Sequence, residues 1–354
     1  MSQLSQNSVQ FLVIGCYTRN AGGDGIGLAV ASRDPATGAL RPAGDPSPTP
    51  SPSFVVHHPT RPVLYAVNEL TDGRVSAFEM AADATLTPCG SWPTGGALPC
   101  HLAVATGARH LLVANYGTGS VASFALDTDG RPGRRADLVV HQGSGKHPER
   151  QERPHAHQVI ATADAVFVVD LGIDSILRYR LDPTNGTLGS GEPAAVLPPG
   201  TGPRYLAMAP SGLVYLVAEL AGTVTVLRPG PGRWEELGSV PTSTSAVDTL
   251  ASEIAVSPDG RWLYVANRGP ATISVFSLGD ELPTLVGEVP TGGSWPRHFV
   301  LVEPYLYVAN QLSHTVTVFR VDPANGIPSP TGDVLATPSP TCLLPVVFNR
   351  QPTA

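Results

Sequence analysis

The chain has 354 residues, 42% of them hydrophobic, so it can bury a large core in one domain or in several. Its 37 Gly and 36 Pro residues are spread along the whole length, which favours many short strands joined by turns. Charged residues make up only 14%, the net charge is −7 and Lys146 is the single lysine, so we expect no nucleic-acid partner.

The N-terminus starts with a polar, uncharged stretch, and we predict a flexible tail over residues 1–10. The apolar run at 11–15 is too short for a signal-peptide core or a membrane span. We therefore expect a cytoplasmic protein with no membrane partner, and the sequence identifies no protein partner. The cysteines lie far apart without a C-x-x-C pair, which favours buried, reduced thiols at Cys16, Cys89, Cys100 and Cys342.

A repeated unit dominates the sequence after three N-terminal strands predicted at 11–18, 25–31 and 40–46. A short strand opens each of six copies, at 52–58, 99–105, 154–160, 202–208, 251–257 and 295–301. A hairpin of two apolar runs around a Gly-, Ser- or Asp-bearing turn follows it, at 64–78, 111–124, 166–179, 214–227, 263–276 and 306–319. A weaker polar strand such as 86–93 completes the unit. Four strands in about 44 to 55 residues are typical of a propeller blade.

The two chain ends complete a seventh unit. The N-terminal strands lack an opening strand, and the segment 340–347 supplies one. A blade built from both ends would close the ring and leave no exposed sheet edge between the first and last blades. The sequence therefore predicts an all-β, seven-bladed β-propeller with four antiparallel strands per blade. It forms a single domain over 11–348, followed by a C-terminal tail over 349–354.

Polar and charged residues recur where the first strand of a blade starts and where the second ends. Both places open on the same face of the ring, which we call the mouth of the central channel. The first-strand residues are His101, His155, His157, Arg204, Glu253, Arg297 and His298. The second-strand residues are Asn68, Glu69, Asn115, Asp170, Glu219, Asn267, Arg268 and Asn310. For Asn115, Asn267 and Asn310 the alternative is a turn-capping role through side-chain-to-backbone bonds.

The connection over 141–157 is longer than its counterparts and rich in Gly, Ser and charged residues. It is either a mobile flap over the mouth or a surface insertion, and Lys146 either meets an anionic substrate or is simply solvated. His155 and His157 lie two residues apart, a spacing compatible with metal binding. No third ligand stands at motif spacing, so we predict neither a metal site nor a cofactor.

Several motifs, taken in order, resemble those of the lactonase-type seven-bladed propellers, which include propeller 6-phosphogluconolactonases and fungal carboxy-cis,cis-muconate cyclases. These motifs are GCYT (15–18), ERQ and PHAH (149–157), GPR (202–204), ASEIAVSPDGR (251–261), YVANRG (264–269) and WPRHF (295–299). The chain departs from the family at Tyr205, where similar proteins usually have His.

This resemblance implies a small anionic lactone or carboxylated ring as substrate, bound at the mouth without metal. It implies a catalytic group drawn from His155, His157, Arg204, Glu219 and Arg268. The substrate contacts that we expect are Glu69, His101, Asn115, Asp170, Glu253, Arg297 and Asn310.

Lactone hydrolysis needs a base to activate water and a positive donor for the oxyanion. A histidine, or Glu219 with a pKa raised by partial burial, could be the base, and Arg204 or Arg268 could hold the carbonyl oxygen. We expect alanine at Arg204 or Glu219 to reduce turnover without altering the folding transition.

Two other functions fit the same sequence. A cycloisomerase would use the same His, Glu and Arg groups to add a carboxylate across a muconate double bond without consuming water. A propeller that only binds a partner is the third possibility, because a fold does not establish a function.

Overall fold

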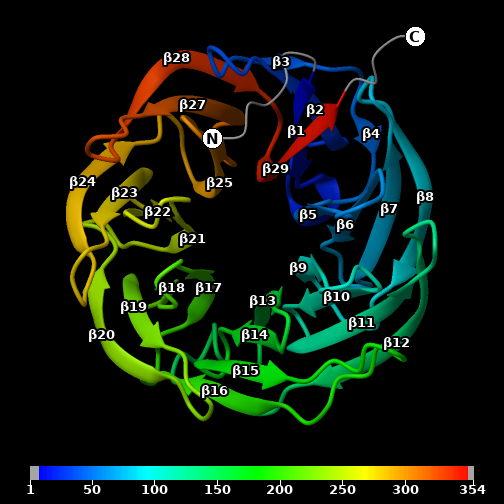
Figure 1. The fold of residues 1–354 in the computed structure, drawn as a ribbon, viewed down its shortest axis with the longest axis vertical. Coiled ribbons are helices and arrows are strands. Elements are labelled where there is room, and N and C mark those ends of the chain that lie inside the picture. Colours follow the sequence, from blue (N-terminus) through cyan, green and yellow to red (C-terminus); the bar gives the residue numbers. More distant parts are fainter. Residues whose placement is uncertain (1–7, 350–354) are drawn as a thin grey trace.

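A computed structural model describes residues 8–349 of the chain. Seven antiparallel sheets stand around a central axis, as Figure 1 shows, and the described part of the chain holds a single short 3₁₀ turn, η1 (Arg19–Ala21), outside them. The predicted seven-bladed propeller with four antiparallel strands per blade is confirmed.

Each of blades 1 to 6 contains four consecutive strands, counted outward from the axis. The innermost strands are β5 (Val55–His57), β9 (Pro99–Val104), β13 (Ala156–Ala161), β17 (Pro203–Met208), β21 (Ala251–Val256) and β25 (Pro296–Val302). The second strands are β6 (Val63–Asn68), β10 (His110–Asn115), β14 (Val166–Asp170), β18 (Val214–Ala218), β22 (Trp262–Asn267) and β26 (Tyr305–Asn310). The third are β7 (Arg74–Met80), β11 (Ser120–Leu126), β15 (Ser175–Tyr179), β19 (Thr223–Arg228), β23 (Thr272–Ser277) and β27 (Thr315–Val321). The outermost are β8 (Leu86–Pro93), β12 (Pro132–Val140), β16 (Glu192–Val196), β20 (Glu235–Pro241), β24 (Thr284–Pro290) and β28 (Pro328–Ala336).

The seventh blade joins the two ends of the chain. Its order is β29 (Pro340–Asn349), β1 (Ser8–Cys16), β2 (Gly27–Arg33) and β3 (Leu40–Pro42), and the short β4 (Ser47–Pro48) also pairs with β2. In Figure 1 the red β29 lies beside the blue β1, and the register pairs Ile14 with Leu343. β1 starts three residues inside the range predicted as a tail, and residues 1–7 and 350–354 lie outside the described residues.

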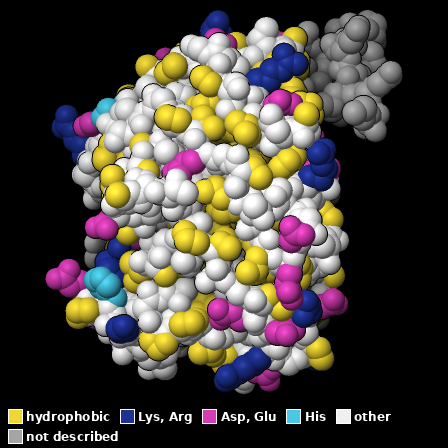
Figure 2. All heavy atoms as spheres, turned by 90° about the vertical axis from the view of Figure 1, so that its left-hand side faces the viewer, with side chains coloured by type: hydrophobic (Ala, Val, Ile, Leu, Met, Phe, Trp, Pro, Cys, Tyr) yellow, Lys and Arg dark blue, Asp and Glu magenta, His cyan; other side chains and the backbone are white. Residues whose placement is uncertain are grey.

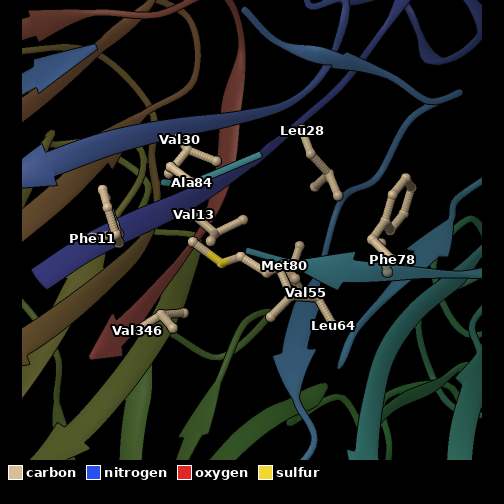
Figure 3. Close-up of a cluster of buried hydrophobic side chains, with 11 residues drawn as sticks. Phe11, Val13, Leu28, Val30, Val55, Leu64, Phe78, Met80, Ala84 and Val346 are labelled. Carbon is tan, nitrogen blue, oxygen red and sulfur yellow. The ribbon is translucent and has the colours of Figure 1, made fainter. Parts of the chain in front are cut away.

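The core lies between neighbouring blades rather than on the axis. In Figure 3, Phe11, Val13 and Val346 of the closing blade meet Leu64 and Met80 of blade 1. Blades are covered on both faces, so their second strands are almost wholly buried, as in VLYAVN of β6. The outermost strand is part exposed, which explains why its sequence signal was weaker.

The outer wall carries charges of both signs. On the side of the ring that Figure 2 shows, Lys and Arg side chains are scattered among Asp and Glu and gather in no single patch. Within residues 8–349, no helix has the length and apolar character needed to span a bilayer.

A bulge near the start of the innermost strand recurs around the ring and determines which side chains reach the mouth. The register shifts between Pro203 and Tyr205, so Arg204 has no partner residue on β18. The same shift occurs in blades 2, 3, 5 and 6 and in the closing blade. A bulge breaks the in-out alternation of a strand and re-aims the extra side chain. The re-aimed residues include Cys100, His157, Arg204 and Arg297.

Candidate active site

Glu219 is the centre of a cluster of arginines at the mouth. Its carboxylate lies 2.7 Å from Nη2 of Arg268, 3.1 Å from Nε of Arg204 and 2.5 Å from Nη2 of Arg150. Glu219 follows β18 and Arg204 belongs to β17, whereas Arg268 follows β22 of the next blade. The structure thus brings together three of the five residues predicted as catalytic.

Arg150 was not among the predicted site residues. It comes from the long connection between β12 and β13, and its side chain is 34% exposed, against 3% for Arg204 and 7% for Arg268. The only sequence signal for it is its place in the ERQ motif, because a loop has no periodicity that indicates where a side chain points.

The charge state of Glu219 contradicts the prediction of a raised pKa. Burial alone would raise its pKa, but Arg268, Arg204 and Arg150 together hold the pKa of this carboxyl well below its usual range. Glu219 is therefore a carboxylate at every physiological pH. It is a counter-ion that orients three guanidinium groups and is unsuited to act as a base.

Arg297 and Glu69 form a second ion pair at the mouth. Nη2 of Arg297 lies 3.6 Å from Oε2 of Glu69, and the hydroxyl of Tyr17 donates to Oε1 of Glu69 at 2.7 Å. The Arg297 guanidinium also covers the Tyr17 ring at 4.7 Å. Both predicted residues are thus at the mouth, and Tyr17, which follows β1, joins them.

The mouth carries an excess of positive charge although the chain is acidic. Four guanidinium groups, of Arg150, Arg204, Arg268 and Arg297, face the carboxylates of Glu219 and Glu69, so two positive charges are uncompensated among these six groups. Burial raises the pKa of Glu253 to about 8, so this third carboxyl is mostly uncharged at neutral pH. An excess of positive charge that is largely shielded from water favours a small anion.

His155 and His157 both contact the Tyr116 ring, His155 by stacking and His157 edge-on at 5.6 Å between ring centroids. His155 stacks on Tyr116 at 4.4 Å between ring centroids, and its Nε2 lies 3.2 Å from a carboxylate oxygen of Glu152. His157 meets Tyr205 edge-on at 5.3 Å. Burial and then the positive charge of Arg204 lower the pKa of His157 well below its usual value, so its imidazole is neutral.

A second layer of side chains lies along the channel. His101 and His298, which belong to it, each directly follow a residue that the bulge re-aims. Nδ1 of His101 accepts from the N–H of Val159 at 3.4 Å, and Nδ1 of His298 accepts from that of Leu343 at 3.3 Å. Each bond satisfies a backbone donor on the free inner edge of the next blade. Burial lowers the pKa of both histidines to about 3, and this structural use argues against His101 as a substrate contact.

Glu253 and Tyr205 belong to the same layer. Oε2 of Glu253 lies 3.6 Å from Nε2 of His298. Tyr205, the position at which the sequence was expected to depart from the family, stands between His101 and His157, at 5.3 Å from each ring. The departure therefore places a phenol among the channel histidines and leaves the arginine cluster intact.

Three predicted substrate contacts are hydrogen-bonded to other groups of the protein. Asn115 donates to Ser120 Oγ at 3.2 Å, and Asn310 donates to Thr317 Oγ1 at 3.0 Å, so both hold their own hairpin. Asp170 is 0% exposed and accepts from the N–H of His155 at 2.7 Å, while its other oxygen binds His141 Nδ1 at 2.6 Å. Both of these asparagine bonds go to hydroxyl side chains of the same hairpin, whereas the capping alternative expected bonds to the backbone.

The connection that carries Arg150 is held to the propeller by Gln151. This side chain is completely buried, and its amide donates to the carbonyl of Leu171 at 2.8 Å and to Asp174 Oδ1 at 2.7 Å. The side-chain oxygen Oε1 of Gln151 accepts from the backbone N–H of His147 at 3.0 Å. These bonds give the loop an internal frame, and Lys146 lies exposed on it beside Gly200.

Several buried polar atoms of the site find no hydrogen-bond partner within the described chain. They include Glu69 Oε2, His157 Nδ1 and Glu253 Oε2. A buried polar atom without a partner is costly, so such atoms are normally satisfied by water or by a ligand. Residues 8–349 contain no group of three or more His, Cys, Asp or Glu side chains placed to hold a metal ion.

The fold and this site together define a class of protein. The family model described as lactonase, 7-bladed beta-propeller, matches residues 11–345, and the chain belongs to this family. It is 32% identical over 308 residues to the 6-phosphogluconolactonase of Bacillus subtilis, which covers 83% of this chain and 86% of the relative.

Solved structures agree along nearly the whole chain. The periplasmic gluconolactonase of Pseudomonas aeruginosa has a TM-score of 0.88 at 28% identity, with 96% of this chain and 99% of that one covered. A Bacteroides fragilis protein reaches a TM-score of 0.89 at 28% identity, with coverages of 98% and 100%.

Proposed function

We propose that the protein is a lactonase that hydrolyses a small phosphorylated sugar lactone of the 6-phosphogluconolactone type. The observation that carries this proposal is the arginine cluster around Glu219. Its uncompensated positive charge suits a phosphate dianion, and guanidinium groups bind phosphate and carboxylate oxygens in pairs. Membership in the lactonase family and the name of the Bacillus subtilis relative support the same reaction.

The roles of the three arginines are assigned from their exposure and from the bonds that they already make within the protein. Arg150 is the most exposed of the three arginines around Glu219, so we assign it to the substrate phosphate. Arg204 and Arg268 are fixed by Glu219 and by backbone carbonyls of β21 and the residue before it, so they are preorganised donors for the lactone carbonyl oxygen. Preorganised donors stabilise the developing oxyanion without reorganising during the reaction.

His157 is the base in this proposal, because its Nδ1 is buried without a partner whereas Nε2 of His155 is bound to Glu152. The low pKa of His157 reflects burial and positive neighbours, and an anionic substrate compensates that charge and raises its basicity. His157 takes a proton from the attacking water as the new C–O bond forms. The ring C–O bond then breaks, and the proton passes to the leaving oxygen to give the open hydroxy acid.

The test is hydrolysis of 6-phosphogluconolactone by the purified protein, measured above the spontaneous rate. We expect turnover, a higher KM for the unphosphorylated lactone, and a loss in kcat of roughly 10²- to 10⁴-fold in His157→Asn. His57→Asn is the matched control, because His57 lies at the far end of β5. Cyclisation of a carboxymuconate without lactone opening would favour the cycloisomerase instead. Binding without any turnover would favour a non-catalytic propeller.

A further inference from the structure

Trp295 has a backbone conformation that its own side chain disfavours. Its φ is +61°, in the left-handed region, where a bulky non-glycine residue is a genuine outlier. The same position, directly before the proline that opens an inner strand, also has positive φ at Ser51, Leu98, Gly202 and Ser339. In blade 4 the residue is glycine, with φ of +60°, so the fold accepts glycine there without strain. The tryptophan in blade 6 therefore stands at a position where glycine would remove the backbone strain.

The indole of Trp295 lies within the site. The guanidinium of Arg268 stands over the ring, 5.4 Å from its centroid, and the residue is only partly buried. The Arg268 head in turn binds Glu219 at 2.7 Å. An aromatic surface thus borders the arginine cluster at the mouth, next to the groups assigned to the lactone carbonyl.

We propose that Trp295 is a specificity-determining residue that receives the apolar face of the substrate ring. This inference rests on the proposed function, in which the substrate is a phosphorylated sugar ring. The C–H face of such a ring is apolar and weakly positive, and it complements the electron-rich face of an indole. A site with arginines alone would bind any small anion, and the indole adds selectivity for an anion that carries a ring.

Glucose 6-phosphate tests this proposal, because it has the ring and the phosphate but no lactone to hydrolyse. Inorganic phosphate is the matched probe without a ring. We expect glucose 6-phosphate to change tryptophan fluorescence in the native protein and in Trp262→Phe, but not in Trp295→Phe. Trp262 begins β22 at the end remote from the mouth, which makes it a suitable control.

Affinity measurements distinguish a contact between Trp295 and the substrate ring from a role in which Trp295 only supports Arg268. In Trp295→Gly we expect the Kd for glucose 6-phosphate to rise about tenfold, with the Kd for phosphate unchanged. Equal losses for both probes, unchanged affinity for both, or no response of the native protein to glucose 6-phosphate would overturn the proposal. Failure of the proposed function is recognised separately, as absence of lactone hydrolysis in the native protein.

Discussion

Glu219 shows how one buried residue determines both the charge and the stability of the site. Its carboxylate and the guanidinium groups of Arg204 and Arg268 are each at most 7% exposed. A buried ion network gains little over an apolar one, but removing one member leaves the others uncompensated in a poor solvent. The arginines cannot swing out to water, because backbone carbonyls also hold them.

We therefore expect Glu219→Ala to destabilise the protein by about 3–5 kcal/mol, measured by urea unfolding. This differs from the sequence-based expectation that alanine there would leave the folding transition unchanged, and the unfolding measurement decides between the two. Glu192→Ala is the control, because Glu192 pairs with Arg178 at 3.3 Å on the surface and is 71% exposed. That change should cost no more than about 1 kcal/mol. If Glu219→Ala and Glu192→Ala lost similar amounts of unfolding free energy, Glu219 and its arginines would be solvated like a surface ion pair.

At the scale of elements, the loop before β13 positions Arg150 through Gln151. We expect Gln151→Ala to raise the KM for the phosphorylated lactone several-fold and to lower kcat much less, because the anion contact becomes loose while the other arginines stay in place. In a double-mutant cycle with Arg150→Ala, the second change should add little to the first. Fully additive effects on KM would mean that Gln151 does not act through Arg150.

The elements themselves could be predicted from the sequence, because every blade repeats the same apolar hairpin with period-two side chains and turn residues. The closing blade followed from a missing first strand at one end and a spare one at the other. The bulges could not be predicted, since they depend on pairing register and not on residue type. Arg150 was missed for a related reason: a loop side chain is placed by tertiary bonds such as those of Gln151, which no local pattern encodes.

The protonation of the site residues also lay beyond the sequence. Glu219 and Glu253 are both buried glutamates near Arg204, yet their pKa values move in opposite directions. Glu219 has three guanidinium groups within 3.1 Å, whereas no arginine of the described residues pairs with Glu253, and the imidazole of His298, 3.6 Å away, is neutral. The difference arises from distances between blades, which exist only once the ring has closed.

At the scale of the whole molecule, the dry channel should make stability depend on pH in a characteristic way. Glu253 has a folded pKa of about 8 against 4.5 unfolded, so the stability linked to its protonation is complete below pH 4.5 and is lost as the pH rises to 8. His101 and His298 have folded pKa values of about 3 against 6.5 unfolded, so their contribution is complete above pH 6.5 and is lost as the pH falls. Between pH 4.5 and 6.5 the free energy of unfolding rises with pH, because the gain from the two histidines exceeds the loss from the single carboxyl.

The unfolding free energy should therefore be greatest near pH 6.5 and should fall by about 2 kcal/mol between pH 6.5 and 8, at 1.36 kcal/mol for each pH unit. In that interval Glu253 is the channel group that loses its proton, so Glu253→Gln should flatten the alkaline limb and keep the acidic one, which belongs to the histidines. Urea unfolding of both proteins across pH 4 to 8.5 measures this difference. An alkaline limb that persists in Glu253→Gln would mean that this carboxyl is already ionised at neutral pH, and the mouth would then carry one positive charge fewer than the anion site requires.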